Sequence, residues 1–104
     1  MIRHIVLTRF SETVTEDTVA EIYNQLEALT QKLAGASGFT GGRSKSPENI
    51  ERGYMHGFVI DFEDWAALQR YTDNAEHKVL GGMLVENAVG GMDGILVLDL
   101  ETRL

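Results

Sequence analysis

Three histidines and one tyrosine are the side chains of this chain best suited to chemistry. The histidines are His4, His56 and His77, and Tyr71 lies shortly before the last of them. Imidazole has an unperturbed pKa of about 6.5, so it gives and takes protons near neutral pH. The pattern predicts one shared pocket, in which His77 removes a proton from an acidic carbon and Tyr71 or a histidine donates a hydrogen bond to the developing enolate oxygen.

The position of His77 favours the role of base. Asn74 is the expected N-cap of a helix, which puts His77 in its first turn. The positive end of a helix dipole opposes protonation of an imidazole and favours the neutral, basic form. Tyr71 ends the preceding helical stretch, so a short connection can hold both side chains over one opening. Phe58 and Trp65 are expected to form apolar walls against a substrate.

A structural role for the same residues stays open. Histidines on strands are often hydrogen-bonded core residues, Tyr71 can equally be core packing, and His77 can be a surface group at a helix start. Three histidines can also bind zinc with an open fourth position, but the chain has no His-x-x-x-His pair, and we expect no metal. No glycine pair has the spacing and lysine of a phosphate-binding loop, and we expect no cofactor.

The elements that must position these residues follow from apolar periodicity and from cap and turn residues. We expect a strand at 2–10, followed by a helix that begins after an N-cap at Thr15 and stops at Gly35. A weak strand at 39–45, a polar loop at 46–53 and a second clear strand at 54–62 come next. The chain then forms a short helix that is capped by Asp64 and runs through Tyr71, a helix from 75 to about 89, and a strand at 95–100.

This order predicts an α+β fold, the ferredoxin-like or split βαβ arrangement, with a four-stranded antiparallel sheet and helices on one face. Residues 1–104 are expected to form one domain. We expect the first and third strands to be parallel neighbours, which puts His4 and His56 at the same end of the sheet. Strand alternation then places both imidazoles on one face, where they adjoin.

The opposite face of the predicted sheet is also apolar. It presents Ile5 and Leu7 from the first strand and Met55, Gly57 and Val59 from the third, and no helix covers it. An apolar face of this extent is too large to leave in water, and the same face of a second copy would close a two-chain barrel. We therefore expect a homodimer, the dimeric α/β barrel.

Composition excludes several other classes of partner. Sixteen acidic residues against nine basic ones give a net charge of -7, which repels phosphate backbones and anionic lipid, so we expect neither nucleic acid nor membrane as a partner. No apolar run approaches the roughly 20 residues that cross a bilayer, and no signal-peptide layout precedes the first strand. We expect a cytoplasmic protein. The absence of cysteine excludes thiolate nucleophiles and disulfides.

Several stretches together resemble one known family. They are residues 1–7, Gly42-Arg43, Ser46-Pro47-Glu48, residues 53–59, Tyr71, His77 and residues 96–99. The pattern resembles the stress-responsive A/B barrel (Dabb) family of dimeric α/β-barrel domains, over nearly the whole chain. The resemblance implies a small-molecule pocket formed by His4, His56, Tyr71 and His77. In a plant cyclase of this family, the residue matching His77 is taken as the general base and the one matching Tyr71 as its partner.

The chain departs from the family next to this pocket. Members often read Tyr-x-x-His-Pro-x-His, whereas this chain has Asn74 and Ala75 in place of the His-Pro pair. Two functional hypotheses remain. The first is a stress-responsive barrel that binds a small hydrophobic carbonyl compound and catalyses cofactor-free cyclisation or isomerisation. The second is a non-catalytic, stress-associated interaction protein that acts through its dimer or a higher assembly.

Overall fold

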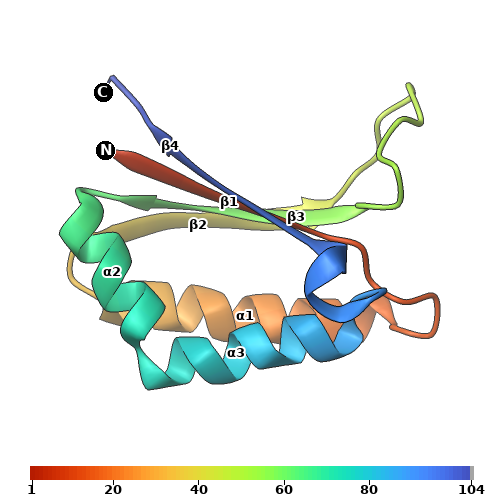
Figure 1. Cartoon of the computed structure of the whole chain (residues 1–104), viewed down its shortest axis with the longest axis horizontal. Helices are drawn as coiled ribbons and strands as arrows, with labels where there is room; N and C mark the ends of the chain where they lie inside the picture. Colours follow the sequence, from red (N-terminus) through yellow and green to blue (C-terminus); the bar gives the residue numbers. More distant parts are fainter. Residues whose placement is uncertain (104) are drawn as a thin grey trace.

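The fold consists of a four-stranded sheet with all of its helices on one face. The structure is a computed structural model that describes residues 1–103. Its elements are β1 (Ile2–Thr8), α1 (Glu16–Lys32), β2 (Ala36–Arg43), β3 (His56–Phe62), α2 (Trp65–Asp73), α3 (Ala75–Asn87), the 3-10 turn η1 (Gly91–Gly94) and β4 (Ile95–Glu101). Figure 1 shows the three α-helices beneath the sheet and the other face of the sheet bare. The predicted order of strands and helices is confirmed.

The helices begin where the sequence supplies a cap. The Thr15 hydroxyl accepts the Thr18 N–H at 3.2 Å, and Glu16 and Asp17 occupy the first turn of α1. The Asp64 carboxylate accepts the Ala67 N–H at 2.8 Å and starts α2. These side chains satisfy backbone donors that have no partner inside the helix, so each helix start is fixed by local sequence.

Gly35 turns the chain from α1 into β2. Its φ of +82° lies in the left-handed region, which residues with a side chain rarely adopt. A Cβ there would also lie 2.8 Å from the Cβ of Ala67. Glycine is therefore required both by the turn and by the close approach of α2.

The strand directions differ from one expectation. The sheet order is β2-β3-β1-β4, and β1 pairs antiparallel with β3 and with β4. His4 lies opposite Ile60, whereas His56 lies opposite Thr8. The expectation of parallel first and third strands is therefore wrong. The crossover through α1 makes β2 run in the direction of β1, and β3, which lies between them, pairs antiparallel with both. His4 and His56 share a face, but His56 lies at the end of β3, opposite Thr8, four residues along β1 from His4.

The core lies between the sheet and the helices. Ile2 and Val6 of β1 and Phe58, Ile60 and Phe62 of β3 are buried on the sheet side. The helices contribute an apolar stripe from α1 and shorter sets from α2 and α3, namely Val19, Ile22, Leu26, Leu29, Ala67, Leu68, Tyr71, Leu80 and Leu84. Fully burying one such aliphatic or aromatic side chain contributes about 1.5–3 kcal/mol, so this layer supplies most of the driving force for the fold.

The helix-free face of the sheet is apolar and uncovered. Its exposed leucines all lie on β4, where Leu96, Leu98 and Leu100 pair in register with Leu7, Ile5 and Arg3. Nothing in residues 1–103 packs over them (Figure 1).

In the same part of the chain, none of the helices combines the length and the apolar character needed to cross a membrane.

Candidate functional site

A cavity of about 480 Å³ opens between the sheet and helices α2 and α3. Its walls are mainly apolar and include Val6, Leu26, Phe58, Leu84 and Val97. The groups able to exchange protons in its lining are His4, Tyr71, His77, Lys78 and Asp99. An apolar cavity with a few convergent polar groups is the usual form of a small-molecule site.

His4 is held by a carboxylate from the neighbouring strand. Its Nδ1 lies 2.6 Å from Oδ1 of Asp99, which pairs with it in the β1–β4 register. His4 is only 7% exposed, so the carboxylate fixes both the orientation of the ring and the proton on Nδ1. Within residues 1–103, Nε2 of His4 has no hydrogen-bond partner, and a neutral ring would use it as an acceptor.

Tyr71 lies between the two imidazoles. Its ring centroid is 4.1 Å from that of His77 and 5.6 Å from that of His4. Its hydroxyl is buried and has no hydrogen-bond partner in the described part of the chain. Burial raises the pKa of Tyr71, so the phenol stays protonated and can donate a hydrogen bond.

His77 is half-buried at the start of α3. Its Nδ1 donates to the carbonyl oxygen of Thr72 at 3.3 Å, which leaves Nε2 as the free lone pair. Burial lowers the pKa of His77, nearby His4 and Lys78 lower it further, and the Thr72 carbonyl opposes them. The ring is therefore neutral at pH 7. The lowered pKa of His77 agrees with the expectation from the sequence, although its main cause is burial and not the helix dipole.

Asn74, at one of the two positions that depart from the family pattern, joins α2 to α3. Its side-chain oxygen accepts the His77 N–H at 3.0 Å and caps α3, while its own backbone N–H donates to the Tyr71 carbonyl at 3.1 Å. One residue thus ends the helix of Tyr71 and begins the helix of His77. This connection sets the distance between the two rings.

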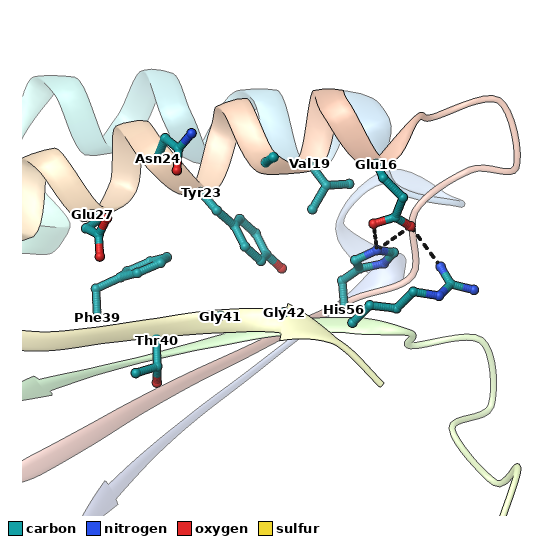
Figure 2. A pocket seen from close by; sticks show the side chains of 12 residues that line it. Glu16, Val19, Tyr23, Asn24, Glu27, Phe39, Thr40, Gly41, Gly42 and His56 are labelled. Carbon is teal, nitrogen blue, oxygen red and sulfur yellow. Dashed lines mark hydrogen bonds and ion pairs between the residues drawn. The ribbon is translucent and has the colours of Figure 1, made fainter. Parts of the chain in front are cut away.

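His56 lies outside this cavity, against expectation. Its Nε2 is 3.0 Å from both carboxylate oxygens of Glu16, and its ring packs against Phe10. It borders a second cavity, between α1 and β2 (Figure 2). The prediction that three histidines share one pocket is wrong for His56, because the antiparallel register carries it to the far end of the sheet.

At two further residues the prediction from the sequence differs from the structure. Trp65 is 49% exposed at the start of α2 and does not line the cavity, whereas Phe58 does. Asp99 was missed. Strand alternation would have found it only after β4 was paired with β1, since that pairing sets it opposite His4. Among residues 1–103, no group of three or more histidine, aspartate or glutamate side chains is arranged to hold a metal ion.

Comparison with protein families gives a match over nearly the whole chain. The model of the stress responsive A/B barrel domain matches residues 2–101. This chain belongs to that family. The chain is 26% identical over 100 residues to the stress-response A/B barrel domain-containing protein HS1 of Arabidopsis thaliana, and the match covers 96% of this chain and 88% of that relative.

Solved structures show the same fold. A dimeric ferredoxin-like protein of unknown function from Jannaschia sp. CCS1 is 35% identical to this A/B barrel protein, with a TM-score of 0.90 and coverage of 97% of this chain and 98% of that one. The hydroxynitrile lyase of Passiflora edulis has a TM-score of 0.83 at 16% identity, with coverage of 99% and 94%. At that identity the likeness concerns the fold alone.

Proposed function

We propose that this A/B barrel protein binds a small hydrophobic carbonyl compound and catalyses cofactor-free proton transfer on it. The observation that carries the proposal is the series of rings His4, Tyr71 and His77 at the polar part of a mainly apolar cavity. The hydroxynitrile lyase of Passiflora edulis adds support at the level of the scaffold, since an enzyme uses this fold.

The proposed chemistry begins with the neutral His77. A C–H bond next to the substrate carbonyl breaks, the proton moves to Nε2 of His77, and the electron pair moves onto the carbonyl oxygen. The protonated Tyr71 donates a hydrogen bond to that oxygen and stabilises its charge. His4, oriented by Asp99, is the second group able to exchange a proton with the substrate. Reprotonation at another atom gives isomerisation, and attack of the enolate on a second carbonyl gives ring closure.

Deuterium exchange tests the first step without knowledge of the natural substrate. Acetophenone is incubated with the protein in D₂O, and loss of its methyl proton signal is followed by NMR. We expect exchange above the buffer rate, loss of this excess in His77→Gln, and an unchanged rate in Val79→Ala, a matched control exposed on the same helix. Equal rates for the wild type and His77→Gln would refute the role of His77.

We further propose that the protein is a homodimer through its helix-free face and that it acts in the cytoplasm. The uncovered leucines of β4 support the interface, and so does the 35% identical Jannaschia protein, which is described as dimeric. The same face supports a second candidate function, in which assembly itself is the activity. Absence of both acetophenone binding and exchange, in a protein that is dimeric, would favour that second candidate.

A further inference from the structure

The cavity between α1 and β2 contains polar groups that the proposed chemistry does not use. It measures about 470 Å³ and lies at the β2 edge of the sheet, whereas His4 lies on β1, on the other side of β3. Figure 2 shows Tyr23 in its middle, Phe39 toward one end and Glu16 with His56 at the other. Gly41 and Gly42 form its floor on β2.

Tyr23 brings an unused hydroxyl to this cavity. The residue is 7% exposed, and its Oη has no hydrogen-bond partner within residues 1–103. The hydroxyl points into the gap between α1 and β2, on the side of Glu16 and His56 (Figure 2). A buried polar atom is costly unless something bonds to it, so this hydroxyl favours a ligand with a polar group.

Close packing fixes the Tyr23 ring in this position. A Cβ on Gly41 would lie 2.9 Å from Cδ2 of Tyr23, so only glycine lets the strand pass so near. Phe39 and Phe58 pack edge-on against the same ring, with centroids 6.0 and 5.4 Å away. A ligand would therefore meet a rigid aromatic surface.

Glu16 supplies a fixed negative charge beside that surface. Both of its oxygens lie 3.0 Å from Nε2 of His56, and Oε1 accepts from Nη1 of Arg43 at 3.0 Å. The hydrogen bond with His56 is the main cause that lowers the pKa of Glu16, which keeps it ionised at pH 7. The side chain is 63% exposed, so its remaining lone pairs are within reach of a ligand.

The charged residues that line the cavity favour a positively charged ligand. Glu16 and Glu27 contribute two carboxylates, and Arg43 contributes the single guanidinium of the lining. An anion would meet net negative charge, and a neutral alcohol would gain no charge pairing. A primary ammonium can donate both to a carboxylate and to a phenol oxygen.

We propose that this cavity is a second binding site, specific for a small primary amine with an aromatic or short apolar body. The ammonium donates to Glu16 and to the Tyr23 hydroxyl, and the apolar body lies against Tyr23, Phe39 and the side-chain-free strand at Gly41. The site is separate from that of the proposed proton transfer, because its lining shares no residue with the cavity of His77.

Three probes of one shape and different charge test the proposal. Benzylamine, benzyl alcohol and benzoate are titrated into ¹⁵N-labelled protein at pH 7, and the amide signals of Gly41 and Gly42 are followed. We expect saturable shifts with benzylamine, affinity lower by about tenfold for benzyl alcohol because the charge-assisted bond is lost, and no saturable shift with benzoate. Stronger binding of benzoate, or shifts only around His77, would overturn the proposal.

Variants separate a site from general attraction between a cation and an acidic protein. Glu16→Gln and Tyr23→Phe are expected to weaken benzylamine binding by about tenfold each, whereas Glu21→Gln, on the same helix but outside the cavity lining, leaves it unchanged. Equal weakening in Glu16→Gln and Glu21→Gln would refute the site. If Glu16→Gln fails to fold, Tyr23→Phe tests the site instead, since it removes only one oxygen atom that has no partner. Undiminished benzylamine binding in Tyr23→Phe would also refute the site.

Discussion

At the scale of single residues, the cavity of His77 depends on one hydroxyl and one ring nitrogen. The hydroxyl of Tyr71 is buried without a partner, and Nε2 of His77 is the lone pair left free by the bond from Nδ1 to Thr72. Both groups are neutral at pH 7 because burial disfavours their charged forms. A protonated phenol beside an unprotonated imidazole is the combination that enolate chemistry requires.

Replacing Tyr71 with phenylalanine separates stability from chemistry. The unpartnered hydroxyl stabilises nothing in the folded protein, and its burial costs about 1–3 kcal/mol, so Tyr71→Phe is expected to leave the free energy of unfolding unchanged or to raise it by about 1 kcal/mol. Acetophenone exchange should fall by about 10²-fold, as for loss of an oxyanion donor. Urea denaturation and the NMR exchange assay measure the two effects. A large loss of stability with unchanged exchange would contradict this.

The titration of His77 gives a second test. Its pKa is lowered in the folded protein, so we expect an NMR midpoint below about 6.5, with the signal assigned through His77→Gln. Between the two pKa values the unfolded chain binds more protons than the folded one. The contribution of His77 to stability is therefore present above about pH 6.5 and is lost as the pH falls. The difference in unfolding free energy between the wild type and His77→Gln should therefore change as the pH falls below about 6.5. A midpoint above 6.5 would contradict the burial argument.

At the scale of elements, the junction between α2 and α3 sets the geometry of the site. Asn74 caps α3 through the N–H of His77 and is also the C-cap of α2, where its own N–H donates to the Tyr71 carbonyl, so both rings depend on one residue. The sequence predicted this cap and the caps at Thr15 and Asp64, because an N-cap bond spans only three residues. Local interactions of this kind are visible in one sequence.

Removing this cap should affect the site as well as stability. Asn74→Ala is expected to cost about 1 kcal/mol of unfolding free energy and to slow acetophenone exchange, because the first turn of α3 carries His77. Asp64→Ala is the matched control. It removes the equivalent bond at the start of α2, to the Ala67 N–H, and should cost similar stability with little change in exchange. Equal slowing in both variants would show that exchange follows stability alone.

At the scale of the whole molecule, the helix-free face remains to be covered. The exposed leucines of β4 continue across β1, where Ile5 and Leu7 are their register partners. Specific interfaces bury about 800 Å² on each partner, which needs a contact that extends over several strands of this face. A second copy that presents the same face satisfies this need with two-fold symmetry.

A charge on this face tests the dimer directly. Leu98 is 51% exposed at the centre of β4, and Leu98→Asp would bury two carboxylates in the symmetric interface, so we expect the mass to fall from twice 11.5 kDa to 11.5 kDa. Val79, 65% exposed on α3, provides the control Val79→Asp, which should stay dimeric. Light scattering after size exclusion measures both. A wild-type protein that is monomeric at micromolar concentration would refute the interface.

The sequence by itself determined the elements, their caps and the apolar faces of the sheet, because periodicity and capping are local. It also predicted that His4, Tyr71 and His77 lie on one side of the sheet. The predicted antiparallel sheet already implied opposite directions for the neighbouring first and third strands, and these directions separate His56 from His4. Only the tertiary structure decided that Asp99 lies against His4 and that Trp65 lies outside the cavity. Local periodicity sets which face of the sheet a residue occupies, whereas the residue opposite it depends on how segments far apart in the chain pair.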